Sequence, residues 1–239
     1  MPMRSWIHSV KPLGDFKTAA AQAETGSSPL PPLLEALSDS SGKDDGPLAR
    51  ALALLFEPSP VLYRTLVPAV ATHIQNAPPV LSYYALIGVA LEVIESWSDT
   101  QKAEFIAGHP RIGEVKGLSQ LSAQEQAAKA TPPEVLARLA HLNACYEHRY
   151  PGLIYITFVN GRSRAEIKDE MEDVLGLEHS LSPDEPPVVS LQSVEMGTEE
   201  WKKELQRAVA DVCKIAKSRL KALGVDSETV VATTAHAQT

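Results

Sequence analysis

Residues 198–223 read TEEWKKELQRAVADVCKIAKSRLKAL, and this stretch decides the fold class. Thr198 suits a helix N-cap, because its hydroxyl can accept a hydrogen bond from a free amide of the first turn. Apolar side chains then recur mostly at three- and four-residue spacings, which is typical of a core-facing helical stripe: Trp201, Leu205, Ala208, Val212, Ile215 and Leu220. The stretch therefore predicts a long helix, ending near residue 223, that buries one face.

The same helical pattern recurs towards the N-terminus between clear turn signals. It predicts helices over 48–56, 81–96 and 164–175, among others. Residues 153–159, LIYITFV, differ, since this β-branched and aromatic composition in isolation predicts a strand or a buried extended segment. One strand is too little for a sheet. We therefore predict an all-α fold, a single-domain helical bundle with long loops.

The distribution of patterned segments predicts the domain organisation. Residues 1–30 are poorly patterned, residues 31–224 carry the helical domain, and residues 225–239 are expected to form a flexible tail. Within the domain, the Pro-rich and acidic stretch 180–194 predicts an exposed loop. No internal repeat is evident.

Composition excludes several classes of protein. The 239 residues carry a formal net charge of −8, with Lys+Arg 22 against Asp+Glu 30, which leaves no broad cationic surface for a nucleic acid. The longest uncharged stretch, 65–91, is interrupted by prolines, so we expect no membrane span. The two cysteines, Cys145 and Cys213, are too few for a disulfide scaffold or a cysteine-rich zinc site, which favours a reducing compartment. No secretory signal is evident at the N-terminus.

His109 is the candidate for acid–base chemistry. It lies between Gly108 and Pro110 in an interhelical loop, where proline restricts the backbone of the residue before it. A stiffly placed imidazole suits a general acid or base. The alternative is a loop histidine that only caps the preceding helix.

Other polar side chains have both a functional and a structural interpretation. Ser122 and Glu125 have the spacing of a capping box, and Gln126 adds an amide beside them, so the same helix start can cap itself or bind an anion. His141 and His148 share one helix face, as two exposed histidines or as a pair of metal ligands. We favour the exposed pair.

Arg219 lies in the apolar stripe of the last helix, beside Leu220 and after Ile215. An arginine in such a place needs an anionic partner. That partner is either a structural carboxylate or a substrate, unless the side chain reaches solvent. If the arginine binds substrate, Arg219→Lys is expected to damage catalysis while leaving stability nearly unchanged.

Taken together, five segments in this order resemble the 2-oxo-4-hydroxy-4-carboxy-5-ureidoimidazoline (OHCU) decarboxylases of urate degradation. They are LFEPSP at 55–60, HPRIG at 109–113, LSAQEQ at 121–126, FVNGRSRAEI at 158–167 and VCKIAKSRL at 212–220. The resemblance runs from about residue 33 to residue 223, and the blocks are specific only in combination. It implies an all-helical fold, in which residues 153–159 are at most an extended start to a helix.

The resemblance also implies the activity and the site. The reaction would be decarboxylation of OHCU to (S)-allantoin without any cofactor or metal, with His109 and Glu125 as catalytic residues. The substrate would be bound by Pro110, Ser122, Gln126, Arg219 and the backbone of Tyr155, Ile156, Thr157, Phe158 and Val159. The alternatives are a non-catalytic helical interaction module on the same scaffold, or a related lyase acting on another small acid.

Assembly and location follow from the resemblance alone. A homodimer is expected, in a peroxisomal or cytoplasmic location, although the C-terminus lacks the usual peroxisomal signal. The sequence also departs from the family. The loop 180–194 resembles an insertion, residues 1–30 match nothing familiar, and the spacing between the His-Pro and Ser-x-x-Glu-Gln blocks is shorter than in animal members.

Overall fold

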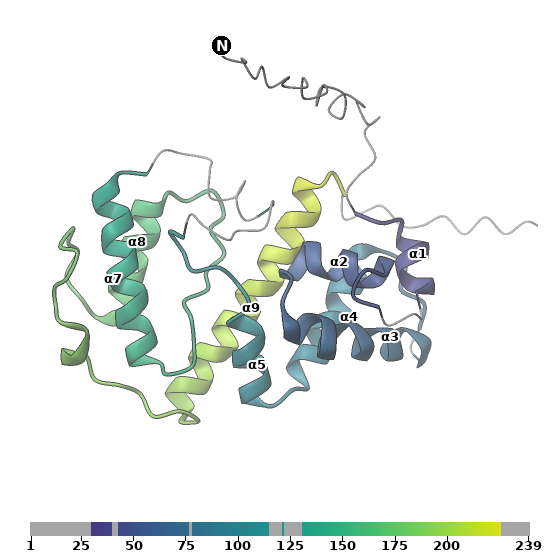
Figure 1. Ribbon diagram of the computed structural model, residues 1–239, viewed down its shortest axis with the longest axis horizontal. Coiled ribbons are helices and arrows are strands. Elements are labelled where there is room, and N and C mark those ends of the chain that lie inside the picture. Colours follow the sequence, from purple (N-terminus) through teal and green to yellow (C-terminus); the bar gives the residue numbers. More distant parts are fainter. Residues whose placement is uncertain (1–29, 40–42, 77, 115–120, 122–130, 226–239) are drawn as a thin grey trace, which may run out of the picture.

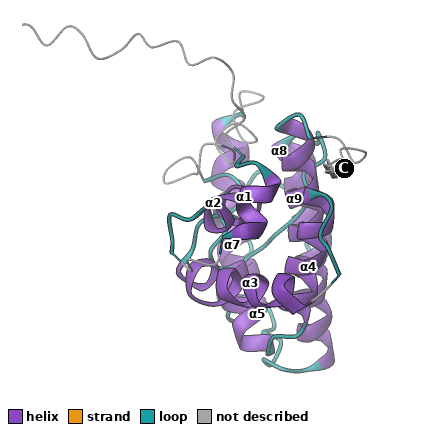
Figure 2. Ribbon diagram, turned by 90° about the vertical axis from the view of Figure 1, so that its right-hand side faces the viewer, coloured by secondary structure: helices purple, strands orange, loops and turns teal. Residues whose placement is uncertain are grey.

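The computed structural model describes residues 30–39, 43–76, 78–114, 121 and 131–225. Within these ranges the chain forms helices joined by loops and contains no strand, as Figure 2 shows. The predicted all-α fold is therefore confirmed. None of the described helices combines the length and the apolar character that a membrane span requires.

The long C-terminal helix α9 (Glu199–Ala222) runs between two groups of helices (Figure 1). The first group lies on one side and includes α2, α4 and α5, which pack directly on α9. Its members are α1 (Leu33–Ser38), α2 (Pro47–Phe56), the π-helical turn η1 (Leu62–Leu66), α3 (Val67–Asn76), α4 (Tyr83–Glu95) and α5 (Asp99–Ile106). On the other side α7 (Pro133–Arg149) packs against α8 (Arg164–Leu175).

The apolar stripe of α9 forms the middle of the core. Trp201, Leu205, Ala208, Val212 and Leu220 are buried as predicted, while Ile215 is half-buried. The five buried side chains belong to one cluster of buried apolar residues that extends along the chain from Leu30 to Leu220, and Ile215 packs against this cluster. The division into a poorly patterned N-terminal segment, one helical domain and a C-terminal tail stays a prediction.

Several predicted helix starts are present with their caps. The Ser163 hydroxyl accepts a hydrogen bond from the amide of Glu166, whose carboxylate returns the contact, so α8 begins with a complete capping box. Thr198 caps α9 in the same way, through the amide of Trp201. The capping box predicted at 122–125 lies outside the described residues.

Residues 153–159 are extended but pair with no strand among the described residues, so the strand interpretation is wrong. The alternative, a buried extended segment, is correct, since residues 153–157 are buried. The segment also does not run directly into a helix, because the turn at Asn160 and Gly161 separates it from α8. Its β-branched and aromatic composition reflects burial between α8 and α9 rather than sheet pairing.

The loop 180–194 is exposed, as predicted, but its backbone is bound by side chains of α7. Arg138 and Glu172 form a buried ion pair, with Nε and Oε1 2.7 Å apart. The Arg138 guanidinium also donates to the carbonyls of Ser182 and Glu185 at the start of the loop. Lys168 joins the same cluster, 2.6 Å from Glu172. Buried charges of this kind are stable because each has a partner.

His141 and His148 fasten the rest of the loop. The Nε2 atom of His141 lies 3.0 Å from the carbonyl oxygen of Pro186, and that of His148 lies 3.1 Å from the carbonyl oxygen of Leu191. Both side chains are half-buried, so the interpretation of this pair as two solvent-exposed histidines is wrong. Their ring nitrogens contact separate carbonyls of the loop.

Candidate active site

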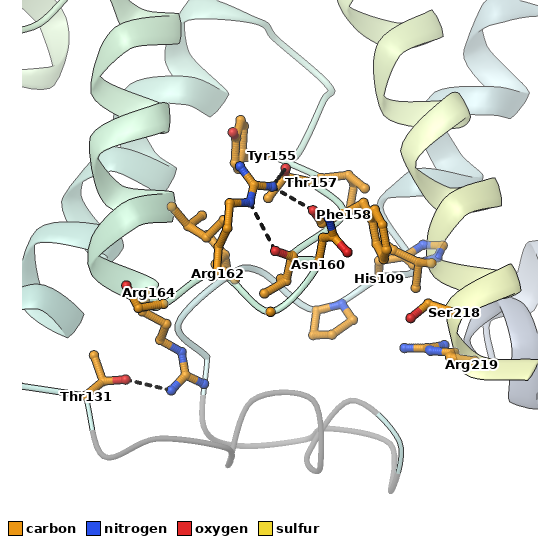
Figure 3. A pocket seen from close by; sticks show the side chains of 18 residues that line it. His109, Thr131, Tyr155, Thr157, Phe158, Asn160, Arg162, Arg164, Ser218 and Arg219 are labelled. Carbon is orange, nitrogen blue, oxygen red and sulfur yellow. Dashed lines mark hydrogen bonds between the residues drawn. The ribbon is translucent and has the colours of Figure 1, made fainter. Parts of the chain in front are cut away.

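A cavity of about 360 Å³ lies between α9, the loop after α5, the extended segment and the start of α8 (Figure 3). Its wall is largely apolar, with a few polar groups converging on it, which is the usual make-up of a small-molecule site. The lining residues are His109, Pro110, Ile112, Thr131, residues 155–164, Ile167, Ile215, Ser218 and Arg219.

The position of His109 is set by close packing of the preceding residue, Gly108, against Ser59. Gly108 packs so closely on Ser59 that a Cβ at position 108 would lie 2.6 Å from the Ser59 Cβ. The amide of His109 donates to the Ile106 carbonyl, at 2.9 Å, and so continues the last turn of α5. The imidazole stands edge-on to Phe105, with ring centroids 5.6 Å apart. Backbone and ring are thus both fixed.

The His109 imidazole is uncharged at neutral pH. Burial, followed by repulsion from the Arg219 guanidinium, lowers its pKa from 6.5 to about 4, although the Glu57 carboxylate acts in the opposite direction. Only 7% of the residue is exposed, and neither ring nitrogen makes a well-aligned hydrogen bond to the described residues, although the backbone of Ile106 and Phe105 lies near enough to act on the pKa in the same direction as Glu57. Buried polar atoms are rarely left unpaired. The two ring nitrogens of His109 are therefore candidates for binding a ligand or accepting a proton.

Arg219 lies on the same side of the cavity as His109 (Figure 3), and it is bound to a carboxylate. Its Nη2 atom is 2.5 Å from Oε1 of Glu57, and both residues are buried. Its Nη1 atom makes longer contacts with the carbonyls of Leu54 and Leu55, at 3.5 and 3.4 Å, at the negative end of α2. Of the two interpretations of Arg219, the structural carboxylate is present. The side chain lines the cavity as well.

The opposite wall is the extended segment, which is held by a second group of charges. The Glu170 carboxylate accepts hydrogen bonds from the hydroxyls of Tyr155, at 2.5 Å, and Thr157, at 2.8 Å. Arg162 pairs with the same carboxylate and donates to the carbonyls of Phe158 and Val159. The segment is therefore a fixed surface with a defined backbone path.

The backbone of this wall is also tied to α9. The Phe158 amide donates to Oδ2 of Asp211, at 3.3 Å, and the Ile156 carbonyl accepts from Arg207, at 2.8 Å. Burial raises the pKa of the Tyr155 phenol to about 12, so this group stays protonated and keeps donating to Glu170.

Arg164 closes the side of the cavity away from His109 (Figure 3). Its Nη1 atom donates to the Thr131 hydroxyl at 3.0 Å, and burial lowers its pKa. Sequence reasoning did not assign Arg164 to the site, nor Thr131 and Ser218. The available signal was the position of Arg164 in the first turn after an Asn-Gly turn, where Asp and Glu are the favoured charges.

The structure brings together most of the predicted site residues. His109, Pro110, Arg219 and residues 155–159 line one cavity, although they come from three separate parts of the chain. Ser122, Glu125 and Gln126 lie outside the described residues. The role of each residue in binding or catalysis stays a prediction.

One group among the described residues has metal-ligand geometry, and it lies outside the cavity. Asp169, Glu172 and His179 bring one ligand atom each within 4.8 Å of one another. Glu172 is already bound to Arg138 and Lys168, so its oxygens are used by cations of the protein itself. The cavity lining offers His109 as a nitrogen ligand but no carboxylate or thiolate to accompany it.

Comparison with known proteins agrees with this arrangement. The sequence model of the family described as OHCU decarboxylase matches residues 43–180, more than half of the chain. This range includes His109 and the extended wall but ends before α9. No curated protein matches the chain. The family match, together with the helical fold and the cavity that contains His109, shows that the chain belongs to the OHCU decarboxylase family.

Proposed function

We propose that this protein decarboxylates OHCU and releases (S)-allantoin. The observation that carries the proposal is the buried, uncharged His109, whose ring nitrogens make no well-aligned hydrogen bond to the described residues, in the wall of a cavity of about 360 Å³. The family match supports a role in urate degradation. A general base with a free nitrogen in a largely apolar cavity is suited to such a reaction.

The substrate provides its own electron sink. The C4 carbon carries a hydroxyl and a carboxylate, and the neighbouring C5 carbon is part of a C=N bond. When the bond from C4 to the carboxyl carbon breaks, its electron pair forms a C4=C5 double bond, and the C=N pair moves to nitrogen, which takes up a proton from solvent. The hydroxyl of this enol then loses its proton as C4 becomes a carbonyl, and C5 gains a proton. One solvent proton is consumed for each carboxylate released as CO₂.

His109 would transfer the proton of the C4 hydroxyl. Because its pKa is about 4, the imidazole enters the reaction as a base rather than as an acid. A bound carboxylate beside the ring would raise this pKa during the reaction and so favour proton uptake. Glu125 is proposed to orient the imidazole or to share the proton relay, with Ser122 and Gln126 binding the ring and ureido groups.

The two walls of the cavity differ in a way that favours one product enantiomer. One wall presents His109 and Arg219, and the other presents the backbone of the extended segment. A planar enol between them would meet donors of different kinds on its two faces. Proton delivery to one face of C5 gives (S)-allantoin rather than the racemate.

Circular dichroism tests the proposal directly. Purified protein is added to freshly generated OHCU, and the optical activity of the allantoin formed is followed. The expected result is a signal that grows with enzyme concentration and reaches the value for (S)-allantoin. A matched reaction without protein gives the spontaneous background. Formation of allantoin at the background rate and without optical activity would contradict the proposal and favour a non-catalytic module.

A further inference from the structure

Glu57 is a buried carboxylate for which the reaction outlined above has no use. It follows the last residue of α2, is 4% exposed and has a φ of 70°, a left-handed backbone value that is unusual outside glycine. Pro58 comes next and restricts ψ of Glu57 to the extended range, which is observed at 135°. Strained backbone of this kind persists only where surrounding contacts hold it.

One contact that holds Glu57 is its ion pair with the Arg219 guanidinium. Nη2 of Arg219 meets Oε1 of Glu57 at 2.5 Å, while Nη1 faces the carbonyls of Leu54 and Leu55. The Glu57 carboxylate and the C-terminal carbonyls of α2 therefore bind two different nitrogens of the planar Arg219 guanidinium. Contacts to two nitrogens fix the plane of the guanidinium at the cavity wall.

We propose that Glu57 is a positioning residue for the decarboxylation: it fixes the Arg219 guanidinium at the cavity wall and offsets its charge beside His109. This inference rests on the proposed function. Glu57 does not line the cavity, so it acts through Arg219 and not on the substrate. The cavity then presents an oriented donor whose cationic charge is largely balanced.

The charge balance matters because of what surrounds His109. The charged groups of the described chain that act on its imidazole are Arg219 from α9 and Glu57 from the end of α2, with the uncharged Phe105 ring of α5 at its edge. A guanidinium without its carboxylate would make protonation of the imidazole harder. Losing Glu57 would therefore weaken His109 as a base as well as loosen Arg219.

A second buried pair in the same protein provides the matched control. Arg138 and Glu172 are as deeply buried as Arg219 and Glu57, but they fasten the loop 180–194 and do not line the cavity. Glu172→Gln and Glu57→Gln thus make the same chemical change in the same kind of environment. Only Glu57→Gln is expected to alter catalysis.

The kinetic test measures kcat and KM for OHCU in both variants. Glu57→Gln is expected to lower kcat about 10- to 100-fold, the scale of a misplaced group in an active site, with no rise in KM because the cation remains. Glu172→Gln is expected to keep the wild-type kcat per folded molecule. In the Arg219→Gln background, Glu57→Gln is expected to lower kcat by a smaller factor than in the wild-type protein, because the orientation of Arg219 can no longer be lost. A double variant whose loss is the product of the single losses would overturn the proposal, as would wild-type kcat in folded Glu57→Gln.

An NMR measurement separates this inference from the proposed reaction. In ¹⁵N-labelled wild-type protein, the Arg219 guanidinium should show slow rotation and protected N–H signals. Glu57→Asp keeps the charge but shortens the side chain, and it remains useful if Glu57→Gln does not fold. Glu57→Asp should remove these signals, and Glu172→Asp should not. Unchanged Arg219 signals in Glu57→Asp would overturn the inference even if the wild-type protein is active. An absence of turnover by wild-type protein would instead refute the proposed reaction, and the NMR signals would then report only whether Glu57 holds the Arg219 guanidinium.

Discussion

Replacing His109 by Gln is expected to remove a pH-dependent part of the free energy of unfolding. The imidazole is almost fully buried beside the Arg219 guanidinium, and its pKa of about 4 lies well below the ordinary 6.5. A glutamine is also polar but does not titrate. Comparing the two proteins therefore isolates the cost of protonating this one ring.

The sign and size follow from the two pKa values. Above pH 6.5 the imidazole is neutral in both folded and unfolded chains, so it adds no pH dependence. As the pH falls from 6.5 towards 4, the unfolded chain binds a proton that the folded chain refuses, and the folded state loses stability. The difference of about 2.5 between the pKa values, at about 1.36 kcal/mol each, gives a loss of about 3 kcal/mol below pH 4.

Urea unfolding at a series of pH values from 4 to 8 measures this loss. Relative to His109→Gln, the wild-type protein should lose about 3 kcal/mol between pH 7.5 and pH 4. His148→Gln serves as a control for the substitution itself, since His148 is half-buried and contacts the Leu191 carbonyl. A difference between wild type and His109→Gln that is the same at both ends of the series would refute the reasoning.

Four further predictions concern the cavity and its chemistry. His109→Ala should fold and lose about 100- to 10,000-fold in decarboxylation rate, the usual cost of a missing acid–base group; near wild-type turnover would contradict its role. Arg219→Lys should lower the free energy of unfolding by roughly 1.5–3 kcal/mol and should also lower kcat/KM, because the ammonium cannot reproduce the planar fork that binds Glu57. The sequence alone predicted a loss of activity with little loss of stability. Chemical unfolding and kinetics on one preparation decide between the two predictions. Gly108→Ala should cost about 1–3 kcal/mol by overpacking against Ser59, and added Ser59→Gly should recover part of it in thermal melts. Exhaustive chelation should leave the OHCU assay unchanged, and loss of activity that one metal restores would contradict a metal-free mechanism.

Helical periodicity and caps made the fold predictable. Residues 81–96 predicted a helix, and α4 occupies 83–95, because a long apolar run without a proline has few alternatives, even with Gly88 inside it. Residues 153–159 misled because β-branched and aromatic composition reports burial, and burial alone does not say whether a neighbouring strand exists. Only the surrounding helices α8 and α9 settle that question.

A site residue was predictable where its neighbours in the sequence indicate its role, and it was not predictable where its role depends on a partner that is distant in the sequence. The His-Pro pair indicated a stiff imidazole without any three-dimensional information. The partner of Arg219 was out of reach, because Glu57 is separated from it by most of the chain and meets it only when α2 packs on α9. The need for an anion was predictable, whereas its identity was not. Homodimer formation and the cellular location stay predictions.

The loop 180–194 is tied down along its length, and this makes it a natural place to open the chain. Its start is fastened to Arg138 and its end to the backbone of Arg149, where the Val194 amide donates to the carbonyl at 2.7 Å. Between these points Val189 is 82% exposed. A chain cut there would keep both new ends attached, so a circularly permuted protein that begins at residue 190 should still assemble its helices. The new termini of such a protein would lie in the loop 180–194, which contributes no residue to the lining of the cavity that contains His109.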